Sequence, residues 1–228
     1  MEPNQEKELH RMTLDTFMMD VYNTFDYMAD KAIQQLINEN SDSWKAYNEC
    51  QAKENSNFND TNEEPLHYLI RTQESSRYMT DIMYRTEEMI AFLEMKVVYS
   101  YKHFEIGIKR LISLAYPETD MSGFFRWKEL NRFLISKAIN IKDISNYREV
   151  NELRIVNNEV KHSGKLGEEI KEISEFKSHD SIQFDPLDRF YRRVKMAPHQ
   201  FLGSLNAAFV NQLYPNVPNS CFGNEKNH

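Results

Sequence analysis

Cysteine is nearly absent from this sequence, since its 228 residues include only Cys50 and Cys221. These two cysteines lie near opposite ends of the chain. Neither belongs to a Cys-x-x-Cys motif or to a Cys/His pattern with metal-ligand spacing. Disulfide-rich domains and zinc modules need several cysteines at short, regular spacings. The sequence therefore argues against a disulfide framework and against a zinc site.

Glycine is equally scarce, with six residues, of which five lie at or beyond residue 123. No Gly-rich loop of the kind that cradles phosphates is present, and neither His-Glu-x-x-His nor Gly-x-Ser-x-Gly occurs. These absences disfavour enzymes with a phosphate-binding loop, zinc proteases and hydrolases with a serine nucleophile. We expect no metal and no cofactor.

Long hydrophobic runs are missing as well. The N-terminus is acidic and no apolar segment typical of a secretion signal follows it. No later stretch approaches the roughly 20 apolar residues that a membrane-spanning helix needs. We therefore expect a soluble, cytoplasmic protein that does not enter a membrane.

Positive charge is lacking in the first part of the chain. Residues 1–64 contain 5 Lys and Arg against 14 Asp and Glu, whereas residues 65–228 contain 23 against 21. Basic side chains are concentrated in residues 126–165. A second basic cluster consists of Arg189, Arg192, Arg193 and Lys195. RNA or another nucleic acid, if one binds, is expected on these basic segments, whereas the acidic residues 1–64 suit a basic protein partner.

Helical periodicity dominates the rest of the sequence. Leu, Met, Glu, Lys and Gln recur at helical spacing, and no strand-rich region or internal repeat is visible. The pattern predicts an all-α protein, an antiparallel helical bundle with an additional N-terminal helical arm. We assign residues 1–64 to an acidic helical arm and flexible loop, residues 65–214 to the bundle and residues 215–228 to a frayed tail.

Breaks in the periodicity predict where helices begin and end. We expect Asn38–Asp42 to end the first helix, residues 51–65 to form a polar loop, and Pro117 to end a long helix. Pro198 is expected to kink or divide the last helix. The expected helices cover residues 6–38, 75–116 and 123–139, a segment capped by Asp143 or Ser145 that stops near Gly164, a short piece at 168–176, and residues 186–213.

Methionines recur at helical spacing along the long segments. Unbranched, polarisable methionine side chains commonly fill gaps between packed helices. The sequence therefore predicts that these methionines are core residues. The residues concerned are Met18, Met28, Met83, Met89 and Met95.

Residues 153–164, Leu-Arg-Ile-Val-Asn-Asn-Glu-Val-Lys-His-Ser-Gly, form the most informative stretch of the chain. At about 100° per residue, one sector of this helix collects Val150, Leu153, Val156 and Val160. The next sector collects Asn151, Arg154, Asn158, Lys161 and His162. Asn157 falls inside the apolar sector, where an amide needs partners, so it either bridges across the bundle or belongs to a site.

The segment Glu152-Leu153-Arg154 with Asn157-Asn158 and Lys161-His162 resembles the signature helix of the HEPN superfamily of small helical bundles. In the family's usual Arg-Asn-x-x-x-His frame, Asn158 and His162 match and Asn157 takes the place of the Arg. Seven residues separate Arg154 from His162. The segment Tyr101–Leu111 resembles the earlier helix of such bundles, in which an acidic residue, here Glu105, often faces the signature. The resemblance covers roughly residues 85–213.

This resemblance implies a metal-independent endoribonuclease or an RNA-binding module, often of a defence or toxin–antitoxin system, with a composite site across a homodimer. RNA supplies its own 2′-hydroxyl nucleophile, so an enzyme needs mainly a proton carrier and cationic stabilisation of the phosphorane. His162 could carry the proton and Arg154 could bind the nonbridging oxygens. Asn158 could orient the histidine or the substrate, while Lys161, Asn157 and Glu105 would contact the substrate.

Each of these residues also has a structural interpretation. His162 at a helix end can interact with free carbonyls and the helix dipole, and Arg154 can pair with Glu105 or Glu159. The alternative function is a noncatalytic helical interaction protein, for example an immunity protein, antitoxin or regulatory subunit, whose acidic surface binds a basic partner. The altered Arg-to-His spacing favours this alternative, and the shared face of Arg154, Asn158 and His162 favours the ribonuclease.

Overall fold

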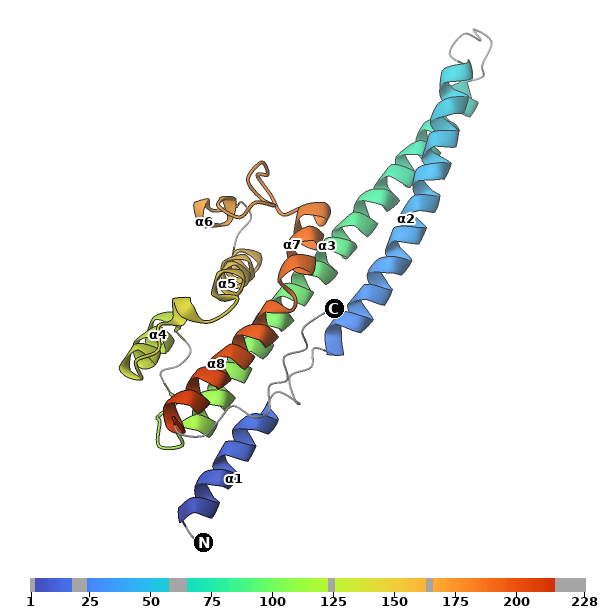
Figure 1. The fold of residues 1–228 in the computed structure, drawn as a ribbon. Coiled ribbons are helices and arrows are strands. Elements are labelled where there is room, and N and C mark those ends of the chain that lie inside the picture. Colours follow the sequence, from blue (N-terminus) through green and yellow to red (C-terminus); the bar gives the residue numbers. More distant parts are fainter. Residues whose placement is uncertain (1–2, 18–23, 58–64, 123–125, 163–165, 216–228) are drawn as a thin grey trace, which may run out of the picture. The chain divides into compact units, whose positions relative to one another are not determined.

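The structure is a computed structural model that describes residues 3–17, 24–57, 65–122, 126–162 and 166–215 (Figure 1). The described residues form helices and no strand, which confirms the predicted all-α class. None of the described helices combines the length and the apolarity that crossing a bilayer requires. The helices are α1 (Pro3–Thr16), α2 (Thr24–Asn57), α3 (Pro65–Ala115), α4 (Trp127–Ser136), the 3-10 helix η2 (Ile141–Asp143), α5 (Tyr147–His162), α6 (Glu168–Lys171), α7 (Phe184–Val194) and α8 (Ala197–Leu213).

Two predictions about α2 are wrong. The helix runs without a break through Asn38–Asp42, because Asn40 and Ser43 form hydrogen bonds with α3 side chains instead of ending the helix. The helix also continues into the expected polar loop as far as Asn57, and Gln51 donates a hydrogen bond to Ser75 of α3. Tertiary partners thus override the local tendency of these polar residues to form turns.

Boundaries elsewhere follow the sequence more closely. The long helix α3 ends at Ala115, two residues before Pro117. Pro198 lies in the first turn of α8, where its missing N–H costs nothing, and α7 ends four residues before it. The predicted helix at 168–176 contracts to the single turn α6. The expected frayed tail from residue 216 and the middle of the expected loop, residues 58–64, lie outside the described residues.

The contacts divide the chain into two units, and α3 and α5 contribute to both. Unit 1 consists of residues 1–22, 102–151 and 196–228, and unit 2 of residues 23–101 and 152–195. The proposed division of the chain at residue 64 remains a prediction based on composition.

Unit 1 has an apolar core between the second part of α3 and α8. Gly107 brings the helices close, because a Cβ at this position would lie 2.7 Å from Leu202 Cδ1. The Phe104 and Phe201 rings meet edge to face with 5.4 Å between centroids. The buried apolar side chains of these helices include Phe104, Ile108, Leu111, Ile112, Phe201, Leu202, Leu205 and Phe209.

Helix α1 is fixed to unit 1 by polar contacts as well as burial. Leu14 is fully buried, and the Asn206 Nδ2 donates a hydrogen bond of 2.9 Å to the Leu14 carbonyl. The His10 Nε2 lies 2.5 Å from the Leu114 carbonyl, which can only accept, and Nδ1 lies 2.6 Å from the Tyr214 hydroxyl. The first helix of the expected arm therefore packs on both α3 and α8.

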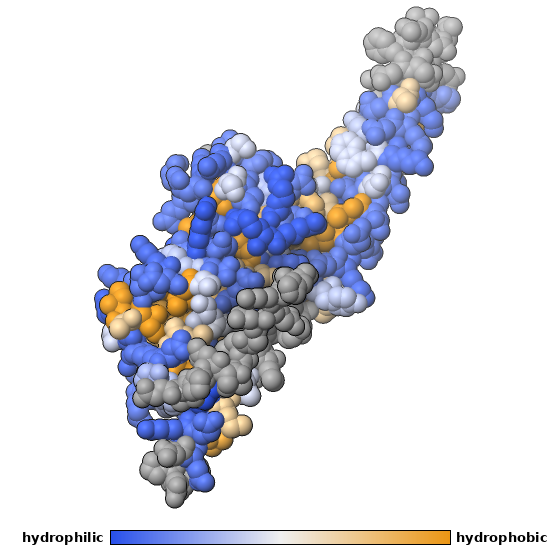
Figure 2. Space-filling view, viewed as in Figure 1, coloured by the Kyte–Doolittle hydropathy of each residue, from blue (hydrophilic) through white to orange (hydrophobic). Residues whose placement is uncertain are grey.

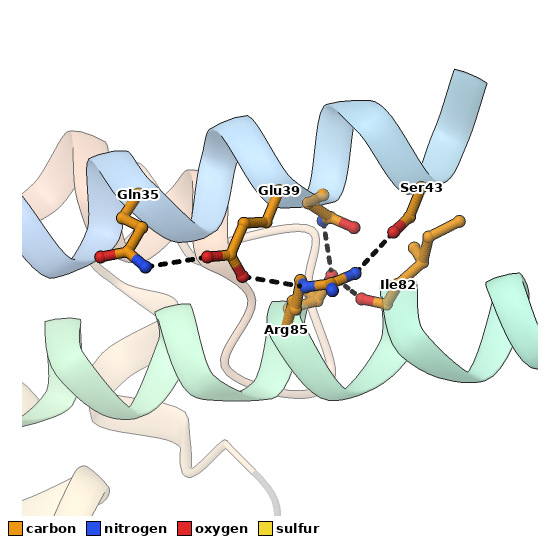
Figure 3. A network of polar contacts seen from close by, with 7 residues as sticks. Gln35, Glu39, Ser43, Ile82 and Arg85 are labelled. Carbon is orange, nitrogen blue, oxygen red and sulfur yellow. Dashed lines mark hydrogen bonds and ion pairs between the residues drawn. The ribbon is translucent and has the colours of Figure 1, made fainter. Parts of the chain in front are cut away.

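Unit 2 contains an antiparallel hairpin formed by α2 and the first part of α3 (Figure 1). Polar side chains bridge the seam between the two helices, as Figure 3 shows. Glu39 accepts hydrogen bonds from Gln35 and Arg85, and Arg85 also donates to Ser43. Buried polar residues of these two helices include Asn40, Ser43, Ser75, Lys96 and Ser100.

Helix α7 covers one flank of the hairpin at Lys96. This lysine is only 4% exposed, forms an ion pair with Asp30, and places its Nζ 4.6 Å from the centroid of the Tyr191 ring. The Tyr191 hydroxyl donates a hydrogen bond to Asp26 of α2. A carboxylate and an aromatic face together compensate the burial of the ammonium group.

The prediction that the methionines are core residues is wrong for three of the four that the structure describes. Met89 is buried, but Met28, Met83 and Met95 are exposed on the hairpin. Met18 lies outside the described residues. Helical spacing shows that residues share one face of a helix, but not that another helix covers this face. In a two-helix hairpin each helix has only one neighbour, so the faces that no further helix covers stay exposed.

Candidate functional site

The predicted site residues Arg154, Asn158, Lys161 and His162 form one edge of α5, which we call the polar edge. Asn158, Lys161 and His162 are exposed, whereas Arg154 is half-buried and has an interaction partner. Val150, Leu153 and Val156 of the same helix are fully buried. The angular assignment made from the sequence agrees with the burial of these three residues, whereas Val160 of the same apolar sector is only half-buried.

Asn157 is buried, as its position in the apolar sector predicts, with 1% of its surface exposed. Its Nδ2 donates a hydrogen bond of 3.3 Å to the Asn158 Oδ1, while its Oδ1 has no hydrogen-bond partner among the described residues. A buried, unpaired amide oxygen costs about 1–3 kcal/mol. Asn157 thus links the helical core to the polar edge through Asn158.

The other flank of α5 carries two glutamates with structural partners. The Glu159 Oε1 accepts a hydrogen bond of 2.7 Å from the Gly167 N–H, and Glu152 lies 2.8 Å from the Arg193 Nη1. The second contact is an ion pair. By helical periodicity Glu159 and Glu152 lie about 60° and 80° from His162, the nearest residue of the polar edge. Both carboxylates have other partners, and Lys161 and His162 form no ion pair within the described residues.

Arg193 of α7 contacts Glu152 of α5 and Glu175, which follows α6. Its Nε donates 2.7 Å to Glu175, and hydrogen bonding to Glu175 raises the arginine pKa. Burial raises the pKa of Glu175, but the hydrogen bonds from Arg193 and Ser174 outweigh burial and hold this pKa below its usual value. The guanidinium also contacts the Phe190 ring, with 5.4 Å to the centroid. Arg193 therefore has a structural role.

The basic cluster of α7 is thus only partly free to meet a nucleic acid. Arg193 pairs with Glu152 and Glu175, and Arg192 pairs with Asp188 at 2.9 Å. Arg189 and Lys195 are exposed and form no ion pair among the described residues. Two of the four predicted cations are therefore already compensated by carboxylates.

Glu105 lies on α3 in unit 1, where it is half-buried. Its predicted place opposite the signature helix, and its contact with a substrate, stay predictions. The Glu159 carboxylate binds the Gly167 N–H, and its predicted pairing with Arg154 stays a prediction.

Sequence reasoning missed the roles of Glu152, Glu159 and Arg193. The helical angles of the two glutamates contained a signal, because both lie outside the polar edge, on the flank of α5 beyond His162. The partners on residues 167–193 could not be found in the same way, because periodicity along one helix does not identify the helix that packs against it.

No protein-family model matches the chain, and no curated protein or solved structure is significantly similar to it. The function is therefore argued from the residues of the polar edge and their surroundings.

Proposed function

We propose that the protein is a HEPN-like RNA-binding protein that contacts RNA through the polar edge of α5. The observation that carries the proposal is the run of exposed Asn158, Lys161 and His162 beyond a half-buried Arg154. The nearest carboxylate on the helix, Glu159, accepts a hydrogen bond from the Gly167 N–H. Lys and Arg attract the phosphate backbone, and amide side chains can hydrogen-bond to sugars and bases.

We further propose that the same edge cleaves RNA without a metal ion when two copies of α5 meet across a homodimer. His162 would take the proton of the 2′-hydroxyl or give one to the leaving oxygen. Arg154 and Lys161 would stabilise the charge that develops on the phosphorane, and Asn158 would orient the histidine. Such an activity fits a cytoplasmic defence or toxin–antitoxin system.

The test measures RNA binding and RNA cleavage with the same variants. Purified protein is mixed with a fluorescent structured RNA in EDTA, and binding is followed by anisotropy over a range of salt concentrations. Arg154→Ala and Lys161→Ala should each weaken binding several-fold and reduce the salt slope by about one. Lys177→Ala removes an exposed lysine of unit 2 outside the edge and serves as the matched control.

Cleavage is read from the same mixtures on a denaturing gel. Cleavage by the wild type that His162→Ala abolishes supports the ribonuclease. Binding without cleavage supports only the RNA-binding module. Absence of binding at high protein concentration refutes both and leaves the noncatalytic interaction protein as the explanation of this chain.

A further inference from the structure

A groove of about 360 Å³ lies between α2 and α3 on the hairpin of unit 2. Its position is distinct from the polar edge, which lies on α5. The residues that line it are Ala32, Gln35, Leu36 and Glu39 of α2, and Glu88, Ala91, Phe92 and Met95 of α3. The apolar centre of this lining is partly open to solvent, since Leu36 and Phe92 are half-buried and Met95 is 43% exposed.

Apolar surface continues beyond both ends of the groove. Met28 lies one turn before Ala32, and Tyr84 one turn before Glu88, and each is 69% exposed. Figure 2 shows apolar atoms between polar ones on the hairpin surface. Exposed methionines and tyrosines on one stripe are typical of surfaces that bind other proteins.

The shape of the groove fits an α-helix. Ala32 and Ala91 face it from opposite walls, and their small side chains leave room between the larger Leu36 and Phe92. A ridge of side chains on a third helix can enter such a space, as in ordinary helix packing. The stretch from Met28 to Glu39 corresponds to about three helical turns.

Charge identifies the kind of helix. Glu88 lines the groove, Glu87 is its neighbour in the sequence, and Asp42 follows Glu39 by about one helical turn. None of these three carboxylates forms an ion pair within the described residues. Glu39 shares its charge with Arg85. Lys31, which precedes Ala32 on α2, lies over the Tyr27 ring, with 4.5 Å to the centroid, and Lys96, which follows Met95, is paired with Asp30. The surroundings of the groove are therefore acidic.

We propose that this groove binds an amphipathic helix of a protein partner, with an apolar face flanked by lysine or arginine side chains. The apolar face fills the groove at Leu36 and Phe92, and the basic flanks meet Glu88 and its acidic neighbours. A second copy of the hairpin does not fit, because its groove carries the same carboxylates and like charges would face each other.

The test uses the full chain and a fluorescein-labelled 18-residue helix of leucine and lysine with one apolar face. A scrambled peptide has the same composition and charge without that face. At physiological salt we expect the amphipathic peptide to bind at least tenfold more tightly than the scrambled one, as measured by anisotropy. Equal binding of the two peptides, or no binding, overturns the proposal.

Variants then locate the binding site. Ala91→Lys places a cation in the groove and Glu88→Lys reverses its charge, and each should weaken binding at least fivefold. Glu74→Lys makes the same charge change on an exposed position of α3 about 20 Å away and should change binding less than twofold. Circular dichroism and the unfolding midpoint check that the variants fold, and an equal loss in Glu74→Lys contradicts the proposed location.

Two further measurements separate the other outcomes. Sedimentation of the wild type and of Ala91→Lys tests for self-association, and a dimer that only the wild type forms would replace the partner helix by a second copy. RNA binding should be unchanged in Ala91→Lys, since the polar edge does not include α3. The groove and the RNA proposal can therefore fail independently.

Discussion

The core of unit 1 and the α2–α3 seam of unit 2 are both contacts between long helices, yet different side chains build them. The unit 1 contact between α3 and α8 is aromatic and aliphatic, with Phe104 against Phe201 and Gly107 against Leu202. The hairpin helices bury apolar residues such as Ile33, Ile82 and Leu93 but also Asn40, Ser43, Ser75 and Lys96. Hydrogen bonds and ion pairs between α2 and α3 bridge the seam.

The difference predicts different strengths for the two contacts. A buried leucine or phenylalanine contributes about 1.5–3 kcal/mol by leaving water, whereas a net hydrogen bond contributes about 0.5–1.5 kcal/mol. A hairpin whose seam includes polar bridges, with an exposed apolar stripe on its flank, gains stability when another helix covers that stripe. The seam thus gives a physical reason for the partner that we propose for the groove.

The largest expected effect belongs to the unit 1 core. Phe201→Ala removes a fully buried ring and should lower the free energy of unfolding by about 3–5 kcal/mol. Amide hydrogen exchange followed by mass spectrometry should show the loss of protection in peptides of α8. Phe201→Leu keeps most of the volume and should cost less than half as much. A loss below about 1 kcal/mol for the alanine variant would contradict close packing at this position.

A smaller effect is expected in the hairpin seam. Arg85→Met keeps the aliphatic stem but removes the hydrogen bonds to Glu39 and Ser43, and should cost about 1 kcal/mol. Urea unfolding measures the free energy, and hydrogen exchange in α2 locates the change. Arg77→Met, at an exposed position of the same helix, is the matched control. A cost of 3 kcal/mol or more would show that the seam resembles the unit 1 core after all.

The smallest expected effect concerns the carboxylate of Glu94 on the hairpin, whose contribution to the free energy of unfolding depends on pH. Burial raises the pKa of Glu94 above the usual 4.5, and the charge of Glu87 adds to this rise. The folded state therefore holds the Glu94 proton more tightly than the unfolded state, and stability falls as pH rises from 4.5 through the folded pKa. Glu94→Gln should remove this loss and stabilise the protein at pH 7 by less than about 1 kcal/mol, because the carboxylate is partly solvated.

Urea titrations at several pH values check this prediction. The difference in unfolding free energy between Glu94→Gln and the wild type should grow from below pH 4.5 to pH 7. Glu74→Gln, at an exposed position of α3, should show no such growth. A Glu94 variant that is less stable than the wild type at pH 7 would mean that the carboxylate has a favourable partner.

Several features of the fold were predictable because they depend on a single helix. The inward position of Asn157 followed from its angle on α5, and the separation of α7 from α8 followed from the missing N–H and fixed backbone of Pro198. The break expected at Asn38–Asp42 was wrong because Asn40 and Ser43 have partners on α3, which a local rule does not include.

The candidate site divides in the same way. The shared edge of Arg154, Asn158 and His162 came from spacing, and exposure of Asn158 and His162 agrees with it. The structural use of Arg193 was not predictable, because its partners Glu152 and Glu175 lie 41 and 18 residues earlier in the sequence. An arginine in a basic cluster has the same local pattern whether it meets a phosphate or a carboxylate.

The sequence by itself determined that the chain is helical and which side chains share each face of α5. Only the tertiary structure decided which faces are covered, leaving Met28 and Met95 exposed on the hairpin and fixing Glu159 to Gly167 beside α5. The physical reason is that periodicity sets the direction of a side chain from its own helix axis, whereas burial and pairing depend on the neighbours that other segments supply.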